Sequence, residues 1–324
     1  MKKTALLLSE ATLLILALFS VANGGTLYLV NNGKARLDVY DPVLQRKTGS
    51  IATAGGPVKA ALSPNKRLLA ITQGENLSEW PDAVRVFDVP KGNVVATVGI
   101  VLTRYRDRGD AFPVFSKDSK KLYTAESGTG FLNVIDASSW KLVKKLALCT
   151  NPLNPVLSAD GKRLYVPCLY SGNVAVVDAE NDLVLDTIKI DGQPSAVAID
   201  LTGKVIYVAD RLNNNVWAMN VKTGGVAKKY AVGSAPSNLM LVNAFLYVLN
   251  THSNTLSVID VERGEDVRSM GIAILPSKMA FDQESKMLYV VSEDASISVV
   301  DTANNERLKN IPIDSIPTDM VFVP

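Results

Sequence analysis

Short apolar runs separated by short polar turns make up nearly the whole chain after residue 22. A clear example is the run Leu246–Asn250, a polar turn, and the run Leu256–Asp260. Valine, isoleucine and tyrosine dominate such runs, whereas glycine, asparagine and aspartate gather in the turns. β-branched and aromatic residues favour strands, and the turn residues end them. No apolar pattern with helical spacing interrupts the series, so the sequence predicts an all-β protein.

The runs recur with a period of about 42 residues. In each unit a first run ends at one of the residues Asn31, Thr72, Glu126, Cys168, Asp210, Asn250 and Ser292. A second run is closed by one of the residues Asp41, Asp88, Asp136, Asp178, Asn220, Asp260 and Asp301. The next apolar stretch then begins near one of the residues Pro57, Asp110, Pro152, Pro194, Pro236, Pro276 and Pro317. The chain therefore contains seven units.

Each unit is predicted to form four strands. Within residues 194–232 the predicted strands are Pro194–Ile199, Val205–Ala209, Val216–Asn220 and Val226–Val232. Four-stranded antiparallel units at this period are typical of a β-propeller. The chain begins with a second strand, Leu27–Asn31, and ends with a first strand within Pro317–Pro324. Both termini are therefore predicted to share one blade, which closes a seven-bladed ring without an open sheet edge.

The repeat also resembles a known family. Leu246–Asp260, Gly192–Pro194 and Ser158–Lys162 are similar to the repeat of the YVTN family of seven-bladed propellers. The resemblance extends over the chain from residue 23 to residue 324 and implies the propeller fold. Such repeats serve many roles, so the resemblance by itself implies no activity.

The first 22 residues have the composition of a secretory signal peptide. A basic start, Met1–Lys3, precedes the apolar run Ala11–Ala22, which ends in the small residues Ser20–Ala22. We therefore expect a signal peptide over residues 1–22, a propeller over residues 23–324, and a protein that is exported to the periplasm or the extracellular space. An uncleaved membrane anchor is disfavoured because the uncharged run is too short to span a bilayer, and no stable membrane insertion is expected.

Charge and cysteine content refine this picture. The formal net charge is +2 at pH 7, and the lysine pairs Lys144–Lys145 and Lys228–Lys229 are interpreted as solvated strand edges rather than as a nucleic-acid site. The two cysteines are Cys149, before a first strand, and Cys168, at the end of a second strand. An even count in an exported protein permits a disulfide, and antiparallel neighbours would bring these two positions together. Buried free thiols are the alternative.

Two insertions interrupt the repeat on either side of one unit, within residues 73–82 and 99–110. In a propeller both connections project from the same face, so the insertions are predicted to be neighbours. Their composition is rich in arginine, acidic and aromatic residues, which is typical of protein interfaces. The predicted partner-binding residues are Glu79, Trp80, Arg104, Tyr105, Arg106 and Arg108. A solvated decoration held by internal ion pairs is the alternative interpretation.

The sequence contains little that indicates catalysis. Its one histidine, His252, falls in a turn, and no nucleophile elbow, Cys-x-x-Cys-His haem motif or calcium loop is present. No cofactor of its own is therefore expected; a haem or metal would belong to a partner chain. At the mouth of the central funnel we expect the residues two positions after the start of each first strand, among them Lys59, Asn154, Asn238, Lys278 and Asp319.

Two functions remain open from the sequence. The chain resembles the propeller subunits of exported redox enzymes such as hydrazine synthase and quinohaemoprotein amine dehydrogenase. This resemblance implies a non-catalytic scaffold or accessory subunit that binds another protein subunit, with a redox protein as the expected partner. The alternative is a small-ligand binder or lactonase-like enzyme that uses the central funnel, with His252 as a candidate base.

Overall fold

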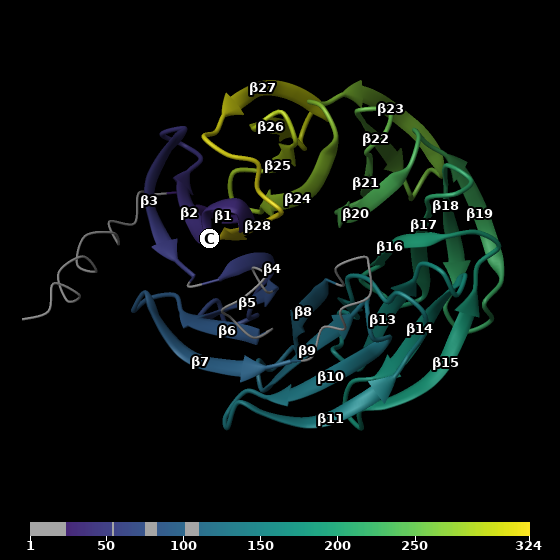
Figure 1. Ribbon diagram of the computed structural model, residues 1–324. Helices are drawn as coiled ribbons and strands as arrows, with labels where there is room; N and C mark the ends of the chain where they lie inside the picture. The colour runs from purple at the N-terminus through teal and green to yellow at the C-terminus, as the bar shows by residue number, and fades with distance from the viewer. Residues whose placement is uncertain (1–23, 54, 75–82, 101–109) are drawn as a thin grey trace, which may run out of the picture.

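The computed structural model describes residues 24–53, 55–74, 83–100 and 110–324. Its strands form seven four-stranded sheets arranged as the blades of a ring (Figure 1). Blade 1 contains β28 (Asp319–Val323), β1 (Thr26–Asn31), β2 (Arg36–Asp41) and β3 (Arg46–Ala52), with a short 3-10 helix, η1 (Asn32–Lys34), between β1 and β2. Blade 2 contains β4 (Gly56–Leu62), β5 (Leu68–Gly74), β6 (Ala83–Asp88) and β7 (Asn93–Gly99).

The other five blades follow in chain order. Blade 3 contains β8 (Ala111–Phe115), β9 (Lys121–Glu126), β10 (Phe131–Asp136) and β11 (Lys141–Ala147). Blade 4 contains β12 (Val156–Leu157), β13 (Arg163–Cys168), β14 (Asn173–Asp178) and β15 (Leu183–Lys189). Blade 5 contains β16 (Pro194–Ile199), β17 (Val205–Asp210), β18 (Asn215–Asn220) and β19 (Val226–Ala231). Blade 6 contains β20 (Pro236–Val242), β21 (Phe245–Asn250), β22 (Thr255–Asp260) and β23 (Glu265–Gly271). Blade 7 contains β24 (Pro276–Asp282), β25 (Met287–Ser292), β26 (Ser296–Asp301) and β27 (Glu306–Pro312).

The predicted all-β, seven-bladed propeller is confirmed, including the way in which the ring closes. β28, from the C-terminus, pairs antiparallel with β1, from the N-terminus, so that Asp319 lies opposite Val30 and Val323 lies opposite Thr26. In each blade the first strand lies toward the centre of the ring and the fourth on its circumference (Figure 1). Among the residues that the structure describes, no helix is long and apolar enough to cross a membrane.

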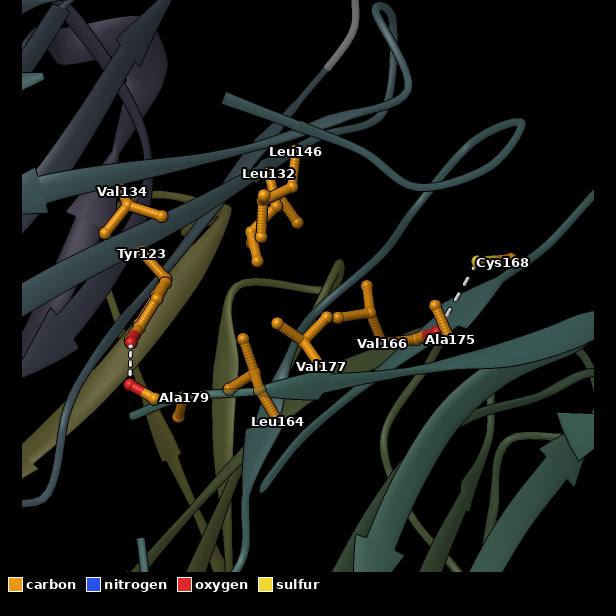
Figure 2. Close-up of a cluster of buried hydrophobic side chains, with 11 residues drawn as sticks. Tyr123, Leu132, Val134, Leu146, Leu164, Val166, Cys168, Ala175, Val177 and Ala179 are labelled. Carbon is orange, nitrogen blue, oxygen red and sulfur yellow. Dashed lines mark hydrogen bonds between the residues drawn. The ribbon is translucent and has the colours of Figure 1, made fainter. Parts of the chain in front are cut away.

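The hydrophobic core lies between the blades rather than within them. Each of its seven clusters combines residues from two neighbouring blades. Figure 2 shows the cluster between blades 3 and 4, where Leu132 and Val134 of β10 pack near Leu164 and Val166 of β13. Successive side chains of a strand point to opposite faces, and both faces of each blade are covered. The middle strands are therefore apolar at nearly every position, as the sequence pattern indicates.

Buried tyrosines of the repeat connect neighbouring blades. The hydroxyl of Tyr123 in blade 3 donates a hydrogen bond to the backbone oxygen of Ala179 in blade 4, at 2.8 Å (Figure 2). Tyr247 in blade 6 likewise reaches the side chain of Asn305 in blade 7. Burial raises the pKa of both tyrosines, so the hydroxyls remain protonated donors at physiological pH.

At its last residue, or one residue earlier in blade 2, the second strand of each blade has a buried position beside the turn to the third strand. The residues at this position are Asn31, Gln73, Glu126, Cys168, Asp210, Asn250 and Ser292. In blade 2 the position belongs to Gln73 rather than to Thr72, because Leu69 pairs with Phe87 as Leu27 pairs with Tyr40 in blade 1. Gln73 donates to the backbone oxygens of Thr53 and Gly55, which fixes the approach to the first strand. Asp210 likewise accepts from the backbone N–H of Gln193, and Cys168 is bonded to Cys149, so in blades 2, 4 and 5 this residue holds the connection from the preceding blade.

The acids that close the third strands are turn residues. Asp136 accepts hydrogen bonds from the hydroxyls and backbone N–H groups of Ser138 and Ser139. These bonds, with that from the Ser138 hydroxyl as the largest influence, lower the pKa of Asp136 to about 2. Asp178 and Asp260 accept from the corresponding N–H groups of their turns. The recurring acid is thus explained by the turn chemistry of the blade.

Candidate functional site

The inner strands of neighbouring blades are tied together around Asp319. Its carboxylate is almost fully buried, with 1 % of the residue exposed. One oxygen, Oδ1, lies 3.4 Å from the Lys278 ammonium nitrogen of blade 7. The other oxygen, Oδ2, accepts a hydrogen bond of 3.0 Å from the backbone N–H of Ala60 in blade 2. The blade that holds both chain ends is therefore bound on each side by one carboxylate.

Lys59 makes a second set of contacts at this level of the ring. Its ammonium nitrogen lies 3.5 Å from the carboxylate of Asp110 and 5.5 Å from the centre of the Phe112 ring. It also donates to the backbone oxygen of Thr318, at 3.4 Å. An ammonium group is attracted to both a carboxylate and an aromatic face. Both funnel lysines therefore lie beside a carboxylate of another blade.

A cavity of about 270 Å³ lies among the inner strands. Its lining comes from β4, β8, β24 and β28, which surround the centre of the ring in Figure 1, and from the segment before β12. Asn154 and Lys278 contribute its polar side chains, while Met279, Phe281 and Met320 are among the apolar ones. The cavity thus combines an apolar wall with the amide of Asn154 and the ammonium group of Lys278, which also lies beside Asp319.

The structure brings only part of the predicted funnel set to this cavity. Asn154 and Lys278 line it, whereas Lys59, Asn238 and Asp319 are not among its lining residues. Asn238 lies at a bulge where β20 pairs with β21 and is partly buried. Apolar inner-strand residues such as Phe281 and Met320 were not predicted as lining. In the sequence they cannot be distinguished from other apolar strand residues, and only their place in a first strand indicates that they could line the cavity.

His252 lies in the exposed turn between β21 and β22. Its backbone N–H donates to the backbone oxygen of Ser234, at 3.2 Å. The histidine is not among the residues that line the cavity, and none of those residues comes from blade 6. Within the described residues no group of three histidine, cysteine, aspartate or glutamate side chains is placed to hold a metal ion.

Cys149 and Cys168 form a disulfide in the structure, with their Cα atoms 5.9 Å apart. The bond lies where the inner strand of blade 4 is irregular: β12 spans only Val156–Leu157. Pro152 and Pro155, just before it, have no N–H to donate to a ladder. The Leu153 N–H still donates to the Pro167 backbone oxygen, at 2.8 Å. The disulfide therefore fixes a segment that has few ladder hydrogen bonds and that contributes Asn154 to the cavity.

Blade 1 contains a cluster of charges that sequence reasoning missed. Asp38 of β2, which is buried, pairs with Arg36 at 2.7 Å and also with Lys47 of β3. Asp314, before β28, lies 3.1 Å from Arg36 and 3.6 Å from Lys34. Partial burial alone would raise the pKa of Asp314, but the ammonium groups of Lys47 and Lys34 outweigh it and hold that pKa below its ordinary value. The cluster joins residues from both ends of the chain.

The six predicted partner-binding residues lie outside the described residues, within 75–82 and 101–109. The strands that flank these segments are described. Gln73 of β5 lies opposite Ala83 of β6, which lies opposite Gly99 of β7. The connections after β5 and after β7 therefore leave blade 2 at the same end of its strands, on one face of the ring.

No protein-family model matches this chain, and no curated protein matches it. Solved structures do resemble it. A protein of unknown function from Desulfotomaculum acetoxidans superposes with a TM-score of 0.75 at 12 % identity, covering 92 % of this chain and 98 % of that one. A chain of hydrazine synthase from Kuenenia stuttgartiensis superposes with a TM-score of 0.69 at 17 % identity, covering 83 % of this chain and 90 % of that one. At such identities the likeness shows the shared propeller fold.

Proposed function

We propose that this protein is an exported, non-catalytic propeller that serves as a scaffold or accessory subunit of a multi-subunit periplasmic redox enzyme. Any haem or metal of that enzyme would belong to a partner chain. The observation that carries the proposal is that the two longest connections of blade 2 leave it at the same end of its strands, on one face of the ring. Loops on a rigid scaffold are where proteins place their binding residues. The fold shared with a chain of hydrazine synthase supports the same class of role.

The composition of the two connections indicates what they bind. Trp80 and Tyr105 supply large flat side chains, and Arg104, Arg106 and Arg108 supply guanidinium groups. Tryptophan, tyrosine and arginine are the residues that most often carry the binding energy of protein interfaces. Three arginines within five residues of the sequence would favour an acidic surface on the partner, because opposite potentials speed association. A redox subunit with an acidic face is therefore the partner that we propose.

The test is co-purification from the native host. Combined Trp80→Ala and Arg106→Ala substitutions are expected to release the partner without lowering the thermal stability of the propeller. The matched control combines Tyr170→Ala and Arg211→Ala, which also remove one aromatic residue and one arginine, from exposed turns of blades 4 and 5 on the same face. Native mass spectrometry of the purified exported fraction measures the complex. Retention of the complex by the first variant would contradict the proposal.

The cavity among the inner strands favours a second candidate, a small-ligand binder or lactonase-like enzyme. Asn154 and Lys278 are its polar lining residues, so they, rather than His252, would orient a ligand. A screen of esters and lactones tests this candidate. If turnover is found and Asn154→Ala abolishes it while His252→Ala does not, the cavity is the site. Absence of turnover together with a stable partner complex would favour the scaffold.

A further inference from the structure

The seven outer strands differ in how they protect their free edges. Each is the last strand of its sheet and is hydrogen-bonded to one neighbour within the blade. Each also contains a β-bulge where it pairs with the third strand. Bulges and charged side chains are two of the devices that prevent an edge strand from pairing with another chain. All seven edges have the first device, so the second one distinguishes them.

Among the seven outer strands, β7 is the one whose sequence has no charged residue. Six outer strands carry charged residues, among them Arg46 and Lys47 in β3, Lys144 and Lys145 in β11, Asp186 and Lys189 in β15, Lys228 and Lys229 in β19, Glu265 and Arg268 in β23, and Arg307 and Lys309 in β27. The sequence of β7 is Asn-Val-Val-Ala-Thr-Val-Gly, with neither a charge nor a proline. Val94 and Val95 are 40 % and 41 % exposed. This is the composition of a strand that pairs readily.

The bulge affects only the first half of β7. The register shifts between the partners of Val86 and Phe87, which lie opposite Ala96 and Val94. From Ala96 to Gly99 the pairing with β6 is regular. Thr97 and Gly99 are exposed, and an added Cβ at Gly99 would meet no atom within 4 Å. The second half of β7 therefore presents an extended, accessible backbone with small side chains.

We propose that this edge pairs with the same edge of a second copy of the chain. A two-fold interface brings each strand antiparallel to itself, so residue i faces residue j and residue j faces residue i. With the axis at Thr97, Ala96 faces Val98 of the other copy, and Val95 faces Gly99, beside which there is open space. The two threonines face each other, which is a favourable cross-strand pair.

A second copy of the chain is a suitable partner for this edge because β7 can pair with itself without bringing like charges together. In β11 and β19 the residues equivalent to Thr97 are Lys145 and Lys229, and a two-fold axis at either would place two ammonium groups together. In β7 the residue on the axis is the uncharged Thr97. The exposed valines of both copies would leave water in the same contact, which adds an apolar contribution.

Sedimentation equilibrium and native mass spectrometry of the whole protein test the proposal. We expect a dimer that dissociates on dilution. Thr97→Lys should raise the dissociation constant at least tenfold, because it places two ammonium groups at the axis. The matched control is Thr187→Lys in β15, since Thr187 pairs with Ala175 as Thr97 pairs with Arg85 and is likewise exposed. A wild-type monomer at all concentrations, or a Thr97→Lys dimer as tight as the wild type, would overturn the proposal.

Cysteine cross-linking provides a second measurement that does not depend on affinity. The chain's two cysteines are joined to each other, so Thr97→Cys introduces a single free thiol. Directly opposed residues of an antiparallel pair have Cα atoms about 4.5–5.5 Å apart, which is within disulfide range. Mild oxidation should link Thr97→Cys into a covalent dimer, whereas Thr187→Cys should remain largely monomeric. Equal cross-linking of both variants would contradict the proposal. Neither measurement involves the two insertions, so the result is independent of the proposed partner subunit.

Discussion

Blades 1 and 4 both depart from the regular blade at their inner strand, and they are held together in opposite ways. In blade 1 the inner strand comes from the other end of the chain, and β28 is joined to β1 only by hydrogen bonds and packing. A buried charge cluster around Asp38 reinforces this blade. In blade 4 the inner strand is reduced to Val156–Leu157, and a disulfide fixes the segment before it. We infer that blade 1 responds to charge and pH, and blade 4 to reductants.

The largest expected effect comes from removing the buried carboxylate of blade 1. Asp38→Ala should lower the free energy of unfolding by about 3 kcal/mol, the lower end of the cost of breaking a buried ion pair. The lower end applies because Arg36 and Lys47 keep 26 % and 25 % of their side chains exposed. Urea unfolding followed by circular dichroism measures the change. The control is Asp186→Ala on the exposed face of β15, expected within about 0.5 kcal/mol of wild type. A loss below 1 kcal/mol for Asp38→Ala would mean that the cluster adds little to ring closure.

Removing the disulfide of blade 4 should cost nearly as much. The two cysteines are 19 residues apart in the sequence, and a loop of this size corresponds to about 3 kcal/mol in the chain-entropy description. Combined Cys149→Ala and Cys168→Ala substitutions should therefore lower the urea midpoint, and a reductant should lower that of the wild type in the same way. The reductant should leave the double variant unchanged. Equal midpoints for wild type with and without reductant would show that the ladder bonds of Leu153 suffice.

A smaller effect is expected where blade 7 meets blade 1. The Tyr40 hydroxyl donates to the backbone oxygen of Pro312, at 3.1 Å. Tyr40→Phe removes this hydrogen bond but keeps the ring, so the free energy of unfolding should fall by about 1 kcal/mol. Tyr170, which is 65 % exposed in a turn of blade 4, supplies the control substitution Tyr170→Phe with no expected change. Urea unfolding measures the stability of both variants. Equal stability would show that the hydrogen bond of Tyr40 adds nothing measurable to the contact between blades 7 and 1.

The sequence predicts the fold well because the repeat is a local pattern. Apolar runs with turn residues at fixed spacing define each strand, and the predicted strands of residues 194–232 agree with β16–β19 to within one residue at every end. The insertion in blade 2 interrupts this spacing, so the sequence pattern places the end of the second strand at Thr72, whereas β5 continues to Gly74 and Gln73 occupies the repeat position. The short β12 was also missed, although Pro152 and Pro155 are the signal for it.

The candidate site was harder to predict because it depends on contacts between distant blades. The pairing of Lys278 with Asp319 joins blades 7 and 1, and the Asp38 cluster depends on Asp314 from the far end of the chain. A residue's place in the repeat fixes its height in the ring. It does not fix which side chain of a neighbouring blade will lie within reach, because that depends on the length and twist of both inner strands.

The smallest expected effect is the pH dependence of blade 1. The pKa of Asp314 is held below its ordinary value of 3.8, so its carboxylate adds stability above that pH. The contribution disappears as the pH falls through the lower folded pKa. Because 52 % of the side chain is exposed, the free energy of unfolding of wild type should exceed that of Asp314→Asn by only about 0.5 kcal/mol at pH 7. The two values should converge toward pH 2.

Urea titrations of both proteins between pH 7 and pH 2 measure this difference. A disulfide does not titrate in acid. When Asp314→Asn is made in the Cys149→Ala and Cys168→Ala background, the change in the free energy of unfolding should therefore have the same size at pH 7. It should also disappear over the same pH range. A difference that stays constant with pH would show that Asp314 acts through packing rather than through its charge. A difference that changes without the disulfide would show that the two blades are coupled, because independent sites contribute additively.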